Sequence, residues 1–294
     1  MKKFVLRAAC LVFVMYGSIC SAKAQTKGLL WQITGKSIKQ PTYLYGTIHL
    51  FDTSLYRIPQ PVMAKLAQTK KVYFELDFGK LNPIELVQYA MVTDSTQYLN
   101  KLLDSASLHK LQEVAKTSPM MQMMGPAMYR LKPLFLTTLL LNNGKAVTID
   151  MEMYNKAKTL HAQVGGLETV AEQMQALNAI PVTTQAKMMQ DFLKTYTSAD
   201  AMIKKLTELY VKQDTKMLLK EMNDDAPLDA SFNEALLIKR NVVMINRMLP
   251  LFGKGSLMVA VGAGHLGSDD GLIALLRKKG YQLKSIPFVF TKAR

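Results

Sequence analysis

The chain has 294 residues, of which 49% are hydrophobic and 20% charged, and its formal net charge is +15. This apolar content is enough for one large core, and no Gly/Ser/Pro-rich linker divides the sequence, so we expect a single domain. The lysines are scattered, without a dense basic cluster or interleaved aromatic residues. This pattern argues against nucleic acid as a partner and favours solubility and association with anionic envelope surfaces.

The first 24 residues have the pattern of a secretory signal peptide. Residues 1–7 are basic, residues 8–20 are almost wholly apolar, and Ala22-Lys23-Ala24 fits the small-x-small cleavage rule. We therefore expect a periplasmic or secreted protein whose domain spans residues 25–294. The segment carries four basic residues and no acid, so its removal lowers the net charge from +15 to +11. Both cysteines, Cys10 and Cys20, lie within it, which excludes a disulfide or a zinc–cysteine site in the mature chain.

Short runs rich in β-branched and aromatic residues predict strands near both ends of the chain. Residues 42–48 and 71–77 form two such runs, and a helix over 62–70 between them predicts parallel, neighbouring strands. The remaining predicted elements are weaker strands at 146–149 and 162–165, a helix at 151–159, a strong strand at 256–261, a helix at 269–279 and a last strand at 283–290.

The region from about residue 80 to 240 is predicted to be mainly helical. Ser231 and Glu234 form a capping box before a helix that ends near Leu249. Most of the 20 methionines lie in this region, with a run at residues 120–124. Such a run is either an adaptable surface for peptide or lipid chains or a loosely packed helical core. The predicted architecture is α/β: a mainly parallel sheet with flanking helices, and a large helical insertion that covers the carboxyl ends of the strands.

Two Gly-x-x-His tetrapeptides lie at opposite ends of the chain, at residues 46–49 and 262–265, and each follows a predicted strand. They contain two of the four histidines. A glycine at a strand end allows the backbone to turn sharply, so His49 and His265 are expected to meet over one crevice. The segment 262–267 also matches the dinucleotide fingerprint G-x-G-x-x-G, but the next strand supplies no acid for a ribose, and we reject that interpretation.

Glu75 lies near the carboxyl end of the strand at 71–77, which we expect to neighbour the strand that ends at His49. Two imidazoles and one carboxylate form a three-ligand site for Zn, Mn, Co or Fe(II) with open positions. Such a metal lowers the pKa of bound water towards about 7. Glu75 is either a ligand or the general base that takes the proton of this water. The alternative is that each histidine is a structural residue with no metal.

Several motifs together resemble the TraB/PrgY/GumN family, in the right order over nearly the whole mature chain. The matching segments are residues 43–49, 74–77, 166–169 with 172–173, 240–241 and 261–266. The family is related to the Tiki metalloproteases, which clip an amino-terminal segment from secreted Wnt proteins, and more distantly to ChaN and erythromycin-esterase-like folds. The resemblance implies a hydrolase that depends on a divalent metal (Mn, Co or Zn), with His49, Glu75 and His265 in its active centre.

The resemblance also marks Glu168, Gln173, Arg240 and Asn241 as family-pattern positions, without defined roles. Glu168 is predicted either to reach the crevice or to cap the following helix. Arg240 is predicted either to stabilise an oxyanion as a catalytic residue or to form an ion pair with Glu168 or Asp77. Asp77 is itself a secondary site candidate whose alternative is a local cap.

The function expected from these patterns is an exported metal-dependent hydrolase that acts on peptides or proteins. Two alternatives stay open: a non-catalytic binder of peptides or pheromones, and a carrier of metal or haem. The oligomeric state has no signal in the sequence.

Overall fold

The computed structural model describes residues 27–142, 144, 146–225 and 233–293. The predicted signal peptide at 1–24 and Ser231 of the predicted capping box lie outside the described residues. Within them, no helix is both long enough and apolar enough to cross a membrane.

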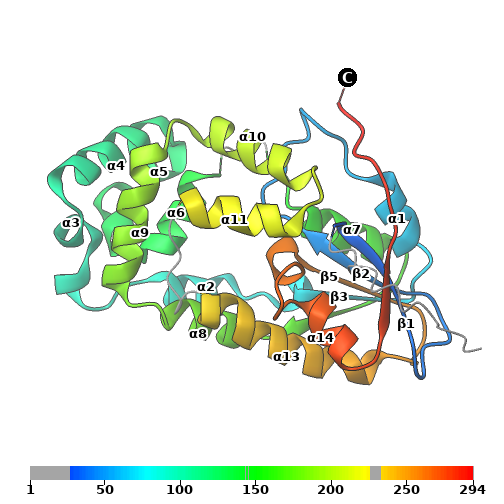
Figure 1. The fold of residues 1–294 in the computed structure, drawn as a ribbon. Coiled ribbons are helices and arrows are strands. Elements are labelled where there is room, and N and C mark those ends of the chain that lie inside the picture. The colour runs from blue at the N-terminus through cyan, green and yellow to red at the C-terminus, as the bar shows by residue number, and fades with distance from the viewer. Residues whose placement is uncertain (1–26, 143, 145, 226–232, 294) are drawn as a thin grey trace, which may run out of the picture.

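The centre of the fold is a six-stranded sheet with the strand order β4-β3-β5-β2-β1-β6 (Figure 1). Strands β4, β3, β5 and β2 run parallel to their neighbours, whereas β1 is antiparallel to both β2 and β6. The prediction of a mainly parallel sheet is therefore confirmed. The strands are β1 (Leu30–Thr34), β2 (Thr42–Thr47), β3 (Lys71–Leu76), β4 (Gln163–Glu168), β5 (Leu257–Gly262) and β6 (Gln282–Ser285).

The predicted adjacency of β2 and β3 is wrong, because β5 lies between them. Thr42 of β2 and Lys71 of β3 are both in register with Leu257 of β5. All residues from Leu257 to Val261 are buried, as expected for a central parallel strand with both faces covered. This order places the strand that leads to His265 directly between the strands that lead to His49 and Glu75.

Two other predictions differ from the structure. Residues 146–149 do not form a strand: Val147 pairs with Phe51 in an isolated bridge, and α7 begins at Ile149. The last strand ends at Ser285 rather than at residue 290, because Pro287 has no N–H to donate to a ladder. Strand β1, which the sequence analysis did not predict, pairs with both β2 and β6.

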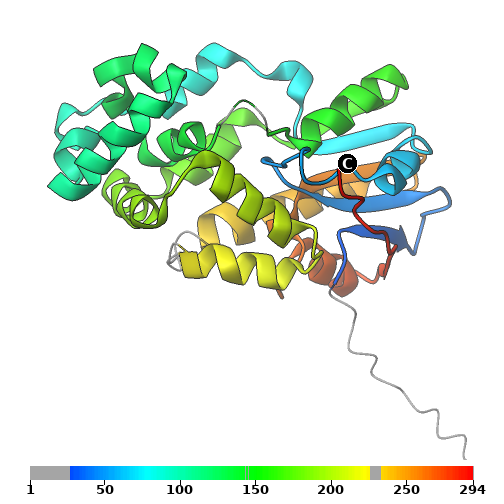
Figure 2. The same ribbon diagram turned by 90° about the horizontal axis from the view of Figure 1, so that it is seen from above.

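Helices cover both faces of the sheet (Figure 2). Helices α1 (Gln60–Leu66) and α7 (Ile149–Thr159) pack on one face, and α13 (Lys239–Met248) and α14 (Leu272–Lys278) on the other. Alternate residues of β2 face opposite layers: Tyr43 and Tyr45 join the first core, whereas Leu44 joins the second. The helices predicted at 62–70, 151–159 and 269–279 correspond to α1, α7 and α14, with ends displaced by up to four residues.

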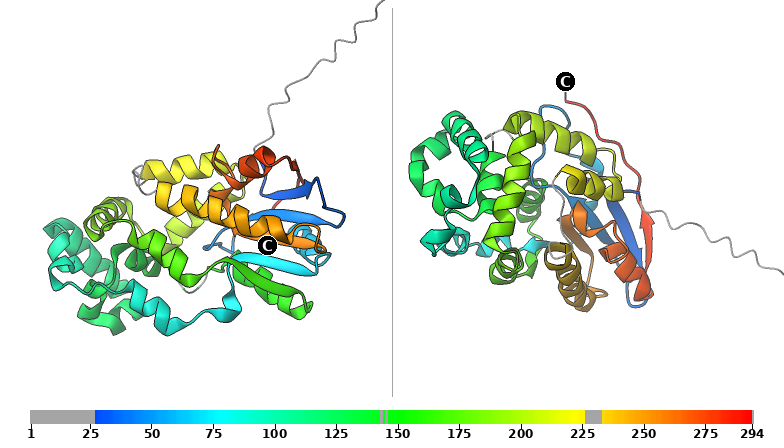
Figure 3. Two further views of the ribbon diagram at one scale, coloured as in Figure 1. Left: turned by 90° about the horizontal axis from the view of Figure 1, so that it is seen from below. Right: turned by 60° about the vertical axis from the view of Figure 1, so that its left-hand side comes forward.

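After β3 and again after β4 the chain leaves the sheet to form a helical part beside the carboxyl ends of the parallel strands (Figures 1 and 3). This part has its own core, in which Leu111, Leu136 and Met189 are buried together. Its helices are α2 (Pro83–Ala90), α3 (Leu99–Leu102), α4 (Ser105–Thr117), α5 (Pro119–Met124), α6 (Pro133–Leu140), α8 (Val170–Asn178), α9 (Val182–Thr195), α10 (Ala199–Tyr210) and α11 (Thr215–Asp225).

Short helical turns connect these elements. They are η1 (Phe78–Lys80), η2 (Ser95–Gln97), η3 (Gly125–Arg130), the π-helical turn η4 (Glu234–Ile238), η5 (Leu249–Leu251) and η6 (Ala263–His265). The last of them contains His265 and follows β5 without a break, so it places that imidazole at the end of the central strand.

Candidate functional site

The two Gly-x-x-His segments follow adjacent strands, because Gly46 and Thr47 of β2 pair with Val261 and Gly262 of β5. A Cβ on Gly46 would lie 2.6 Å from Cδ1 of Leu266, and one on Gly262 would lie 3.1 Å from Oε1 of Glu75. Neither glycine has a positive φ. Their role is therefore close packing of the two segments and of Glu75, rather than a left-handed turn.

Glu75 is buried at the end of β3 and accepts hydrogen bonds on both oxygens. Its Oε1 accepts from the Gly262 N–H at 2.7 Å, and its Oε2 accepts from Gln173 Nε2 at 3.1 Å and Arg240 Nη2 at 2.6 Å. Burial alone raises the pKa of Glu75, but His265, Arg240 and the Gly262 N–H more than offset it and lower the pKa to about 2. The carboxylate is therefore ionised at neutral pH.

His265 is buried and faces Glu75. Asn241 Nδ2 donates to the carbonyl oxygen of Asp270, so the amide oxygen of Asn241 is the acceptor for His265 Nδ1 at 2.7 Å. This assigns the proton to Nδ1 and leaves the lone pair on Nε2, which lies 3.6 Å from Glu75 Oε1. Burial lowers the pKa of His265 to about 4 against the attraction of Glu75, so the ring is neutral at pH 7.

Arg240 joins two buried carboxylates. Its Nε and Nη2 donate to Glu168 at 2.9 and 2.7 Å, Nη2 also donates to Glu75, and Nη1 donates to the Leu236 carbonyl at 3.2 Å. The side chains of Arg240, Glu75 and Glu168 are only 12%, 8% and 1% exposed. Burial raises the pKa of Glu168, and the hydrogen bonds and positive charge of Arg240 oppose this rise. The geometry matches the ion pair with Glu168 that the sequence analysis kept as an alternative for Arg240.

His49 has a different environment, since 66% of its side chain is exposed. Its Nδ1 lies 3.2 Å from Oδ2 of Asp150, a buried acid whose Oδ1 accepts from Thr47 Oγ1 at 2.7 Å. Desolvation lowers the pKa of His49, but the carboxylate of Asp150, assisted by Glu75, outweighs it and raises the pKa to about 9. In the described part of the chain, no three His, Cys, Asp or Glu side chains are gathered as a metal site.

The pair formed by His265 and Glu75 fits a divalent cation. A neutral imidazole nitrogen and a carboxylate oxygen, both bearing lone pairs, face each other at 3.6 Å with no proton between them. The ionised carboxylate of Glu75 also favours a cation. Hydrogen bonding of the distal ring nitrogen is typical of histidines that bind metals, and both His265 and His49 have an acceptor beside Nδ1.

Comparison with known proteins identifies the family of the chain. The model of the TraB/PrgY/gumN family matches residues 29–285. The chain belongs to this family. It is 23% identical to a protein named Metalloprotease TIKI2 from Danio rerio, with 88% of this chain and 61% of the relative covered. It is also 23% identical to Metalloprotease TIKI1 from Homo sapiens, with 91% and 64% covered. The chain thus spans less than two thirds of these relatives, and no solved structure matches it.

Of the family-pattern positions, Glu168, Gln173, Arg240 and Asn241 all lie in the hydrogen-bond network around Glu75 and His265. Asp77 does not: it accepts from the Gly79 N–H as the cap of η1. Helix α8 of this family member is capped by Thr169 with Glu172, so Glu168 is not its cap.

Asp150 is the site residue that sequence reasoning missed. It lies in the first turn of α7, directly after the buried Ile149, and its carboxylate is almost fully enclosed. An acid that follows a buried residue at a helix start is an ordinary feature, so its position signals little. Its contact with His49 depends on the antiparallel bridge between Phe51 and Val147, which only the tertiary structure supplies.

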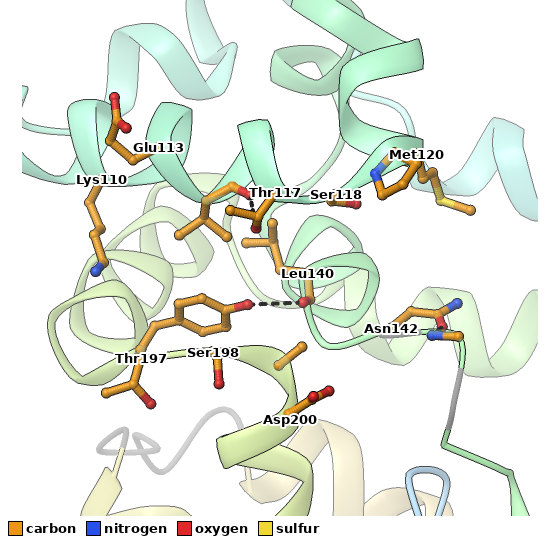
Figure 4. A pocket seen from close by; sticks show the side chains of 15 residues that line it. Lys110, Glu113, Thr117, Ser118, Met120, Leu140, Asn142, Thr197, Ser198 and Asp200 are labelled. Atoms are coloured by element: carbon orange, nitrogen blue, oxygen red, sulfur yellow. Dashed lines mark hydrogen bonds between the residues drawn. The ribbon is translucent and has the colours of Figure 1, made fainter.

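A cavity of about 810 Å³ lies in the helical part (Figure 4). Its lining includes Met120, Leu140 and Tyr196 but none of the predicted site residues. The methionine run is divided, because Met121 is buried whereas Met123 is 83% exposed. The run thus serves both the helical core and the surface.

Proposed function

We propose that this chain is an exported hydrolase that depends on a divalent metal and cleaves peptide bonds. The observation that carries the proposal is the pair of opposed lone-pair donors, Nε2 of His265 and Oε1 of Glu75, each held by neighbouring hydrogen bonds. Membership of the TraB/PrgY/gumN family and distant similarity to proteins named metalloproteases support it.

In this proposal His265 and Glu75 would hold the metal, and His49, which is not gathered with them in the described residues, would join as a third ligand. A divalent cation would supply Lewis acidity, which lowers the pKa of water and polarises an acyl oxygen. The remaining chemistry belongs to the chain. Glu75 is ionised, so it would serve either as a ligand or as the general base for water. His49 would bind as a neutral ligand, with Asp150 orienting its ring from Nδ1.

Arg240 acts as a positioning residue in this scheme. Its N–H groups are directed at Glu75, Glu168 and the Leu236 carbonyl, so it fixes the rotamer of Glu75 and maintains its negative charge. Asn241 has the matching role for His265, because it fixes the tautomer that leaves Nε2 unprotonated. The substrate of the proposed enzyme is a peptide or protein in the periplasm or outside the cell.

The test is cleavage of a peptide library, analysed by mass spectrometry, with Mn, Co or Zn added separately to metal-depleted protein. We expect cleavage with at least one metal, and its loss in E75Q and H265A. The matched control is H109A, since His109 lies on α4 with a side chain that is 75% exposed. Elemental analysis of each variant reports the bound metal.

Two outcomes would contradict the proposal. Peptide binding without turnover under all three metals would select the non-catalytic binder. A Soret band in the protein as isolated would select the haem carrier.

A further inference from the structure

The outer edge of β4 is the sheet edge that leads to the candidate site. Strand β4 pairs with β3 on one side, and no strand of the described residues pairs with it on the other. Edge strands present N–H and C=O groups that have no partner strand, and an extended chain can pair with them. The opposite edge of the sheet is β6, at the far end of the strand order.

A groove of about 550 Å³ follows this edge. Four consecutive residues of β4, Gln163 to Gly166, all line it. Gln163 and Val164 have side chains on opposite faces of the sheet, so a groove that both of them line includes the strand edge. Tyr73 of β3 and Lys80 and Glu85 from the segment after β3 complete part of its wall.

The main chain along this groove is directed outward at alternate residues. The Gln163 N–H donates to the Lys70 carbonyl at 2.8 Å, so Gln163 and, two residues on, Gly165 direct their main-chain groups towards β3. Val164 and Gly166 then direct theirs towards the groove. All three residues from 164 to 166 are half-buried, and the two glycines allow close packing against the Tyr73 ring and the backbone at Asp77.

The groove continues to the candidate site. It is also lined by Glu168 and Thr169 at the carboxyl end of β4. Glu168 is hydrogen-bonded to Arg240, and Arg240 to Glu75. A chain that extends along β4 in the direction of the strand therefore reaches the end of the sheet where Glu75 and His265 lie.

We infer that an extended peptide substrate binds as an additional strand along the outer edge of β4, with its main chain paired to Val164 and Gly166. This inference rests on the proposed function, because the occupant is the peptide that the enzyme cleaves. Strand addition gives affinity through main-chain hydrogen bonds, and side-chain preference only at alternate positions. A tolerant peptidase that requires an unfolded or extended segment is the expected consequence.

The first test is amide hydrogen exchange of the full chain with short labelling times. The probe is an excess of blocked decapeptide amides of randomised sequence. We expect exchange at the Val164 and Gly166 amides to slow about tenfold, the factor that corresponds to roughly one hydrogen bond. Exchange along β6, the other edge strand, should be unchanged and serves as the internal control.

The second test uses substitutions at Val164. Proline removes the outward N–H, and edge strands tolerate proline where that N–H faces away from the ladder. V164P should raise KM for a cleaved decapeptide about tenfold and leave kcat nearly unchanged. V164A is the matched substitution that retains the N–H, and it should raise KM much less than V164P does. If V164P does not fold, the exchange measurement on the unmodified chain decides.

The outcomes separate this inference from the proposed function. Cleavage without slower exchange at β4 overturns strand addition and leaves the hydrolase in place. Slower exchange at β4 without cleavage under any metal supports strand addition and contradicts the hydrolase. Absence of both contradicts both, and equal slowing along β6 shows that peptides coat sheet edges without a specific site, which also overturns the inference.

Discussion

The two Gly-x-x-His segments have the same spacing and follow adjacent parallel strands, yet their histidines differ in charge. His265 is 4% exposed and hydrogen-bonded to a neutral amide, and its pKa is lowered. The His49 side chain is 66% exposed and lies beside the carboxylate of Asp150, and its pKa is raised. Burial therefore keeps His265 neutral, whereas the carboxylate of Asp150 keeps His49 protonated, although both rings belong to the same tetrapeptide.

This difference assigns separate tasks to the two histidines. His265 is neutral over a wide range of pH and, with Glu75, forms the permanent half of the proposed metal site. His49 carries a proton at neutral pH and must release it before it binds a cation. Metal binding is therefore expected to release a proton from His49. We also expect the cation to bind His265 and Glu75 before it binds His49.

The half of the proposed metal site formed by His265 and Glu75 depends most on Arg240. Removal of Arg240 should therefore have the largest effect on stability. R240M leaves Glu75 and Glu168 buried without their cation, and we expect a loss of about 3–5 kcal/mol in the free energy of unfolding. Urea denaturation measures it. The control is R247M, whose partner Glu172 is 37% exposed, and which should cost about 1 kcal/mol or less. Equal losses in both variants would refute the special role of the buried cluster.

The next largest effect is expected from loss of the contact that fixes the tautomer of His265. N241L retains the shape of the side chain but removes the acceptor for Nδ1–H, so the ring is free to rotate or to carry its proton on Nε2. We expect metal affinity to fall about 10- to 100-fold, as for other partners of metal-binding histidines. Isothermal titration with Mn, Co or Zn measures this. D150N, which retains Oδ1 for Thr47, is the comparison at His49. Unchanged affinity in N241L would show that the amide does not orient the ring.

The first glycine of each motif tests whether close packing or backbone conformation matters. In G46A the new methyl group meets Leu266, which can rotate, and Ala263 Cα at 3.1 Å, which cannot. We expect a destabilisation of about 1–2 kcal/mol, at the lower end of typical overpacking costs. In G262A the methyl group meets Oε1 of Glu75 instead, so metal affinity should fall more than stability. Thermal unfolding and metal titration, performed on both variants, separate the two effects.

Whether the sequence predicts the position of a site residue depends on which contacts place that residue. The pairing of the two motifs was predictable, because each follows a buried run with strand character and parallel strands end at the same side of a sheet. The position of β5 between β2 and β3 was not, since strand order depends on crossover connections that periodicity does not encode. The ion pair of Arg240 with Glu168 remained one alternative of two for the same reason: α13 packs beside β4 only in the tertiary structure.

The smallest predicted effect concerns His49. The stability of the metal-depleted protein should depend on pH through the charge of this ring. The folded-state pKa of His49 is raised above its unfolded value of about 6.5. Its interaction with Asp150 therefore stabilises the fold fully below that unfolded pKa and is lost as the pH rises through the folded pKa of about 9.

The free energy of unfolding should fall over this window in the original chain and fall less in D150N, because the amide introduced by this substitution carries no charge. Urea denaturation at intervals from pH 6 to 10, with chelator present, measures the two slopes, and NMR titration of the His49 ring measures the pKa directly. Since 66% of this side chain is in solvent, the difference in slope is expected to be small and to shrink further as salt is added. Identical slopes and an identical ring titration in D150N would show that Asp150 leaves the charge of His49 unaffected, and the two motifs would then differ in burial alone.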